Sequence, residues 1–248
     1  MIQKPIPAIT KADIDALIEN AVREDRTLDY KETLPGRSDG EKYEFLADIS
    51  SFANASGGDI LYGVREKREQ GKPSGVPEGA IGLSGIVPDA EILRLQSIIR
   101  DGIAPRIANV QIIAVPGFTN DPVLLVRIPK SWASPHIISK RDSRFYSRTS
   151  AGKYPLDVAE IRSVFALSES LPDKIRRFRD DRVATIVADE TPVKFSGASR
   201  VLLHLLPIAA LEPTSRFDTG HGGTGSGHGV RARGQTFISR LSFNIVVR

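Results

Sequence analysis

Apolar positions recur along the first two-thirds of the chain at two spacings, one helical and one alternating. Spacings of three and four residues predict helices over residues 10–22, 41–55, 89–102 and 157–166. Alternating or continuous apolar runs predict strands over residues 28–31, 59–64, 110–115, 123–128 and 145–148. The stretch 65–88 is polar, with Gly and Pro throughout, and we expect a long loop or a small hairpin there.

The order of these elements indicates the fold class. It reads α-β-α-β-α-β-β-β-α, so an early alternation of strands and helices is followed by a hairpin of residues 110–115 and 123–128. This order predicts an α/β (α+β) fold, in which helices pack against a mixed β-sheet. We expect this domain to occupy residues 10–168.

The pattern changes after residue 168. We expect residues 169–215 to form a linker and a partial second α/β unit, with strands over 182–188 and 200–209. Residues 216–248 include the run TGHGGTGSGHG, whose density of Gly and Ser predicts a flexible tail.

Composition excludes several classes of chemistry. The 248 residues include no cysteine, which rules out disulfides, zinc sites built on cysteine and thiol catalysis. A formal net charge of +4 permits a polyanionic partner without requiring one. We find no apolar run of signal-peptide length and none of the roughly 20 residues that span a bilayer, so we expect a cytoplasmic protein with no membrane partner.

Three short motifs stand in a fixed order along the first domain. They are EDRTLDYKE at residues 24–32, ISSFANASGGDILYGV at residues 49–64 and RFYSRTSAG at residues 144–152. Gly57 and Gly58 lie between a helix and a buried strand, where glycine allows close approach of two backbones and a positive φ. We therefore predict an architectural role for both glycines.

In these motifs the chain resembles the Schlafen AlbA_2 family over roughly residues 20–165. That family's pattern is a Glu, a Glu-Phe-Lys strand, a helix ending in Ala-Phe-Ala-Asn-x-x-Gly-Gly, a strand ending in Gly-Val, and then Tyr-x-Arg before a turn of small residues. The resemblance implies the same mixed fold and a nucleic-acid partner, either DNA or RNA. Residues 10–168 are accordingly expected to be a nucleic-acid-binding domain of bacterial type.

The resemblance also implies a catalytic and metal-binding trio of acids. In nuclease members of the family, three acids bind a divalent cation and support cleavage of structured RNA. Glu24 matches the first acid, Asp29 stands where the family usually has Glu, and Glu66 approximates the third. Oxygen ligands of this kind suit Mg²⁺ or Mn²⁺. Acids near helix ends are also common on solvated surfaces, so a purely structural role stays open.

A basic segment between residues 127 and 153 is the best candidate for binding nucleic acid. Its Lys and Arg can neutralise phosphates, and its interleaved aromatic residues can stack on unpaired bases. Alternation along residues 145–148 predicts that Arg144, Tyr146 and Arg148 share an exposed face, while Phe145 points into the core. The candidate binding residues are Lys31, Lys140, Arg141, Arg144, Tyr146, Arg148 and Lys153.

Three functions remain open from the sequence. The first is a nucleic-acid-binding protein with a regulatory role. The second is a divalent-metal-dependent endoribonuclease or nuclease. The third is a non-catalytic scaffold that forms a homo-oligomer or binds a partner protein through the second unit. No GxxxxGK[ST] motif occurs, so the sequence indicates neither a nucleotide cofactor nor an ATPase.

Overall fold

The computed structural model of the chain describes residues 1–139 and 143–190. The chain divides into two compact units, Met1–Asp173 and Lys174–Arg248. The first unit contains a four-stranded sheet in the order β1-β2-β7-β6. Its strands are β1 (Leu28–Lys31), β2 (Gly58–Tyr62), β7 (Val123–Ile128) and β6 (Gln111–Val115).

The sheet is mixed, as the sequence predicts. Strand β1 pairs with β2 in parallel, whereas β7 pairs antiparallel with both β2 and β6. The predicted hairpin is therefore confirmed, and so is the α/β (α+β) fold class. Three two-stranded ribbons complete the strands of the described residues: β3 (Val64–Glu69) with β4 (Lys72–Ala80), β5 (Ile103–Ala104) with β8 (Ile137–Ile138), and β9 (Tyr146–Thr149) with β10 (Gly152–Pro155).

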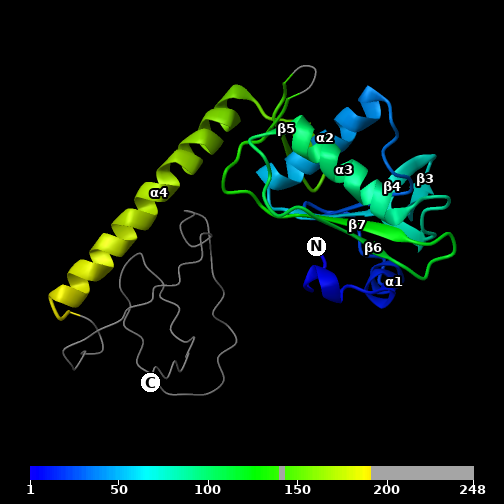
Figure 1. Ribbon diagram of the computed structural model, residues 1–248, viewed down its shortest axis with the longest axis horizontal. Helices are drawn as coiled ribbons and strands as arrows, with labels where there is room; N and C mark the ends of the chain where they lie inside the picture. The colour runs from blue at the N-terminus through cyan, green and yellow to red at the C-terminus, as the bar shows by residue number, and fades with distance from the viewer. Residues whose placement is uncertain (140–142, 191–248) are drawn as a thin grey trace, which may run out of the picture. The chain divides into compact units, whose positions relative to one another are not determined.

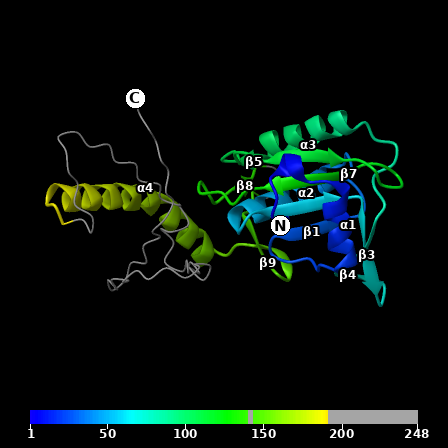
Figure 2. The ribbon, with the colours of Figure 1, turned by 90° about the horizontal axis from the view of Figure 1, so that it is seen from below.

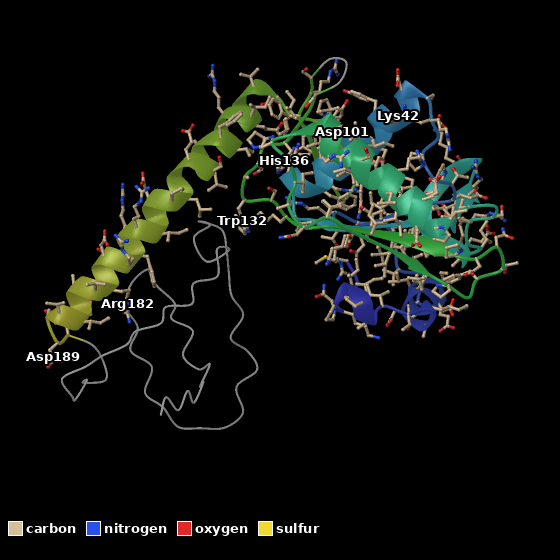
Figure 3. All side chains as sticks on the ribbon, in the orientation of Figure 1. Lys42, Asp101, Trp132, His136, Arg182 and Asp189 are labelled. Carbon is tan, nitrogen blue, oxygen red and sulfur yellow. The ribbon has the colours of Figure 1, made fainter. Side chains whose placement is uncertain are left out.

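Helices cover both faces of the sheet (Figures 1 and 2). One face carries the short helix η1 (Ile6–Ala8) and α1 (Lys11–Glu19), and the other carries α2 (Asp39–Asn54) and α3 (Pro88–Gly102). In Figure 3, Lys42 marks the first turns of α2 and Asp101 marks the last turn of α3. A further helix, α4 (Val158–Val187), crosses the boundary between the two units.

The alternation of side chains along β1 determines which face of the sheet carries its charged residues. Leu28 and Tyr30 are buried against the α1 face, in a cluster that includes Ile14. Asp29 and Lys31 consequently point to the opposite face, towards α2. That face holds the larger apolar cluster, with Phe45 and other residues from α2, α3, β2, β6 and β7.

The structure refines several sequence predictions. The polar stretch 65–88 contains the β3–β4 hairpin, which settles the choice between a loop and a hairpin. The strand predicted over 182–188 is wrong, because residues 182–187 continue α4. Alternating apolar residues in so short a segment fit either period, and here the preceding helix extends through it. The strand predicted over 200–209 and the glycine-rich tail over 216–248 lie outside the described residues.

Among the helices of residues 1–139 and 143–190, none combines the length and the apolar character that a membrane-spanning segment needs.

The two motif glycines allow the close approach that the sequence predicts. Gly57 has a φ of +71°, and a Cβ there would lie 2.5 Å from the backbone nitrogen of Lys130. A Cβ on Gly58 would lie 2.4 Å from the Phe52 ring and 2.5 Å from the Thr27 carbonyl oxygen. The glycine pair thus allows the chain to pass from α2 into β2 in close contact with the Phe52 ring of α2.

We predict that Gly58→Ala destabilises the domain by about 1–3 kcal/mol or more, because the added methyl group overlaps a ring and a backbone oxygen. Gly79→Ala on β4 is the matched control, since no atom lies within 4 Å of the Cβ that it would add. Chemical denaturation of both variants measures the difference. Equal stabilities for the two variants would contradict the architectural role of Gly58.

Candidate nucleic-acid interface

A buried carboxylate, Asp29, lies at the centre of the charged residues on the α2 face. Only 5% of Asp29 is exposed. Its Oδ1 accepts a hydrogen bond from Lys31 Nζ at 2.8 Å, and both terminal nitrogens of Arg148 lie 3.4 Å from its Oδ2. The Arg148 guanidinium stacks 3.6 Å from the centroid of the Phe52 ring. Two cations therefore offset the cost of burying this charge.

Glu24 lies beside Asp29 at the outer edge of β1. Its Oε1 accepts a hydrogen bond from the Tyr30 N–H at 2.6 Å, which satisfies a donor on an edge strand. Burial, a hydrogen bond with Asp29 and the Asp29 charge raise the pKa of Glu24 to about 8. Burial also acts to raise the pKa of Asp29, but Lys31, Glu24 and Arg148 together lower it below its usual value. The pair therefore holds one neutral and one ionised carboxyl group at neutral pH.

Glu66, the third predicted acid, reaches the same region from β3. Its Oε2 accepts a hydrogen bond from the Gly75 N–H at 2.9 Å, while the Gly75 carbonyl accepts one from the Glu24 N–H at 2.7 Å. The three acids are thus neighbours, and the Glu66 charge also acts to raise the pKa of Glu24.

These acids do not form a metal site as they are arranged. Within the part of the chain that the structure describes, no three His, Asp or Glu side chains are placed to hold a metal ion. Glu66 is bonded to Gly75, and Asp29 already has two cations beside it. Binding of Mg²⁺ or Mn²⁺ would require these side chains to change partners.

A second charged group continues from the first through Lys31. Lys153 on β10 makes contacts of 2.8 Å with Asp48 Oδ1 and with Glu44 Oε2, both on α2. Burial raises the pKa of Asp48, although Lys153 and Lys31 act in the opposite direction. Burial acts to lower the pKa of Lys31, but the charges of Asp29 and then of Asp48 raise it above its usual value. Acids and cations therefore alternate from Asp29 through Lys31, Asp48 and Lys153 to Glu44.

A cavity of about 600 Å³ opens beside this second group. It lies over the first half of α2, the segment that follows β1, and β10. Its lining residues are Lys31, Thr33, Leu34, Pro35, Ser38, Gly40, Glu41, Glu44, Phe45, Asp48, Tyr62 and Lys153.

The predicted binding residues do not all lie on one exposed face. Lys31, Arg148 and Lys153 belong to the charged groups just described, and Arg144 is exposed. Lys140 and Arg141 lie outside the described residues. The Tyr146 hydroxyl lies 3.2 Å from that of Tyr43 on α2.

The predicted exposure of Arg148 is wrong, because only 5% of this residue is accessible. Tyr146 and Arg148 do point towards a common partner, but that partner is α2 rather than solvent. The Phe52 ring and the Asp29 carboxylate together favour burial of the guanidinium. Phe145 is only half-buried and contacts Phe165 of α4, with ring centroids 6.1 Å apart.

Asn54 explains why the motif at the end of α2 carries an amide. Its Nδ2 donates to the carbonyl oxygens of His136 at 3.0 Å and Tyr146 at 2.8 Å. Its Oδ1 accepts from the His136 N–H at 2.7 Å. One side chain therefore fastens the start of β9 to the end of α2, which positions Arg148 beside Asp29.

Sequence reasoning missed two parts of this surface. One is the set of cations on the β3–β4 hairpin, where Arg65, Lys67, Arg68 and Lys72 are exposed next to the Glu24 region. The other is the cavity with Asp48. A signal existed for the second part, because Asp48 interrupts the apolar face of the predicted helix 41–55.

The family model described as Schlafen, AlbA_2 matches residues 24–157, which is more than half of the 248 residues. The chain belongs to this family. No curated protein matches it.

Among the solved structures that are similar to the chain, two share 17% sequence identity with it. The DIP2311 protein from Corynebacterium diphtheriae is 17% identical, with a TM-score of 0.40 over 60% of this chain. This chain covers 30% of that protein. The N-terminal domain of a protein described as RecG-related, from Nitrosomonas europaea, is also 17% identical, with a TM-score of 0.37. That match covers 49% of this chain and 74% of the other.

The raised pKa of Glu24 predicts how stability depends on pH. Between the ordinary value of 4.5 and about 8, the folded chain keeps a proton that the unfolded chain has lost. Stability should therefore fall as pH rises through this window. Glu24→Gln keeps the hydrogen bonds without the charge, so it should melt at a higher temperature than the parent near pH 9 but not near pH 5.

Thermal unfolding across this pH range checks the expectation. Glu19→Gln, at the exposed end of α1, is the control and should follow the parent at every pH. A melting difference between the Glu24 variant and the parent that stays constant with pH would show that Glu24 is not protonated in the folded chain.

Proposed function

We propose that this AlbA_2 domain binds nucleic acid over the surface formed by β1, β10 and the β3–β4 hairpin. The observation that carries the proposal is the set of cations on the hairpin beside Lys31. The hairpin extends from the sheet near β1 (Figure 2). A two-stranded ribbon of this kind is narrow enough to enter a major groove, and its cations can equally follow the phosphates of a single strand.

Two lysines of the hairpin are the best candidates for phosphate contacts. Arg65 pairs with Glu32, and Arg68 donates to the Gly71 carbonyl. Lys67 and Lys72 are exposed and form no ion pair with another residue of the described chain. The hairpin also carries Glu66, Glu69 and Glu78, so its net charge is small. Binding should therefore depend on individual lysines rather than on a broad positive field.

The paired cations of the α2 face complement the hairpin. Lys31 and Lys153 keep part of their side chains exposed, at 38% and 24%. Their carboxylate partners hold both ammonium groups in place, which lowers the entropy lost on binding a ligand. The surface thus combines exposed lysines on the hairpin with lysines held by carboxylates on the α2 face.

The double variant Lys67→Ala/Lys72→Ala should weaken binding to a labelled oligonucleotide. Because each phosphate contact contributes about 0.7 to 0.9 to the slope of log K against log salt, the slope should fall by roughly 1.4 to 1.8. Fluorescence anisotropy over a series of salt concentrations measures both effects.

Lys4→Ala/Lys11→Ala on the α1 face removes the same formal charge and serves as the control. If the two double variants behave alike, net charge rather than the hairpin governs binding. If the hairpin variant binds like the parent at every salt concentration, the proposed surface is wrong.

A second function, cleavage of the bound strand, is favoured by the Glu24–Asp29 pair. A neutral carboxyl group can donate a proton to a leaving oxygen, and an ionised one can accept a proton from an attacking water. Groups with such displaced pKa values often mark catalytic sites. The role of Mg²⁺ or Mn²⁺ rests on the family resemblance, and no step through a metal follows from the arrangement of these acids.

If the domain cleaves RNA or DNA, Glu24→Ala and Asp29→Ala should each abolish cleavage without weakening binding in EDTA. Neither variant removes a cation from the surface, and Asp29→Ala removes a negative charge near a polyanion. Asp29→Glu restores the family's usual side chain and should retain activity. Gel assays with and without Mn²⁺ or Mg²⁺ give the readout. Cleavage that persists in both alanine variants would exclude the pair as the catalytic groups.

A further inference from the structure

The cavity over α2 is distinct from the Glu24–Asp29 pair, although the two share Lys31. Its volume of about 600 Å³ falls within the roughly 300–1,000 Å³ of small-molecule sites. The space is sufficient for one nucleobase with its sugar and far too small for a duplex. Its lining combines four apolar or aromatic residues with five charged ones.

The charged groups of the cavity argue against a phosphate as the ligand. Three carboxylates, Glu41, Glu44 and Asp48, line it together with the two lysines. Lys153 contacts both Asp48 and Glu44, so its positive charge is already offset. A phosphate would be repelled, whereas an uncharged polar group that offers N–H donors would be favoured.

Two polar groups retain capacity to bind a ligand. Asp48 is buried, and its Oδ1 contacts Lys153, while within residues 1–139 and 143–190 its Oδ2 has no hydrogen-bond partner. Lys31 Nζ donates one hydrogen bond, to Asp29, out of the three that an ammonium group can make. The cavity thus presents an acceptor and a donor, held by separate elements.

The edge of guanine matches this pair of groups. Guanine presents a carbonyl oxygen followed by two adjacent N–H donors, and a carboxylate can accept from both donors. Uracil and thymine have one N–H between two carbonyls, and adenine and cytosine have one amino group each. Only guanine offers two neighbouring donors to Asp48 and an acceptor to Lys31.

The apolar lining fits the faces of such a base. Leu34 and Pro35 are half-buried on one side of the cavity, and Phe45 and Tyr62 contribute from its floor. In a duplex the edge that Asp48 would read is occupied by the opposite base. A protein reads that edge only when the base is unpaired.

We infer that this cavity binds one unpaired guanine of a nucleic-acid strand, with Asp48 accepting from its two N–H donors and Lys31 donating to its carbonyl oxygen. The inference rests on the proposed function and names the part of the strand that the domain selects. The hairpin lysines then hold phosphates regardless of sequence, and the cavity supplies the preference for a base.

The test compares short labelled single strands of thymidines that carry one central guanine, inosine or adenine. Anisotropy should show tighter binding of the guanine strand by about tenfold, since one well-placed bidentate contact discriminates by this order. Inosine lacks the second donor and should bind with intermediate affinity. Asp48→Asn should remove the preference for guanine over adenine, because an amide cannot accept from both N–H donors.

A second variant guards against damage to the Asp48–Lys153 contact. Thr33 is exposed and lines the cavity, so Thr33→Trp should block it without disturbing the core. Thr119→Trp places the same residue on an exposed loop outside the cavity and should retain the preference. Equal binding of guanine and adenine strands by the parent, or a preference that survives both cavity variants, overturns the inference.

Separate measurements distinguish failure of nucleic-acid binding from failure of guanine recognition by the cavity. Lys67→Ala/Lys72→Ala should weaken all strands equally and leave the preference for guanine unchanged. If the chain binds no strand at all, calorimetric titration with guanosine and adenosine tests the cavity directly. Binding of guanosine that Thr33→Trp abolishes would support the cavity, and no binding of either nucleoside would exclude it.

Discussion

The burial of the Asp29 carboxylate is the constraint on which the rest of the site depends. A charge removed from water costs several kcal/mol unless cations and hydrogen bonds compensate it. Here compensation comes from Lys31 on the same strand, from Arg148 on β9 and from the proton on Glu24. The position of β9 against α2, the stacking of Arg148 on Phe52 and the pairing of Glu24 with β1 all satisfy this one requirement.

Helix α2 provides the common support. Its side chains fill the core on one face of the sheet, and along one side it presents Glu44, Asp48 and Phe52 to β10 and β9. Asn54 then closes the arrangement by bonding to the backbone of His136 and Tyr146. The charged groups consequently sit on a rigid element, which suits a surface that must hold a ligand in one orientation.

Periodicity was enough to predict α1, α2, α3, the first part of α4 and the four strands of the main sheet. The helices repeat an apolar face over several turns, and the central strands β2 and β7, buried on both faces, are continuous apolar runs. Periodicity did not predict which face of β9 is buried. Alternation groups Tyr146 with Arg148, but only tertiary packing decides that this face meets α2. The same limit applies to residues 182–188, where a short pattern is compatible with either a strand or a helix.

The motifs identified the three acids but did not predict their protonation states. Glu24, Asp29 and Glu66 were named from the resemblance, and the structure makes them neighbours. Their protonation follows from burial and from the cations nearby, neither of which a linear sequence displays. The cavity escaped notice for a similar reason, since its lining comes from residues that are distant in the chain, such as Thr33 and Lys153.

The pairing of Asp29 with Arg148 joins residues 119 positions apart and has a consequence for how the domain is made. During synthesis the chain exposes β1 and α2 long before β9 exists, so the carboxylate must remain hydrated until almost the whole domain has left the ribosome. Contacts of such long range are among the last that a chain can form. The contact that organises the surface therefore also delays the formation of that surface until β9 has been made. A chain that ends before residue 148 lacks Arg148 and cannot complete the site.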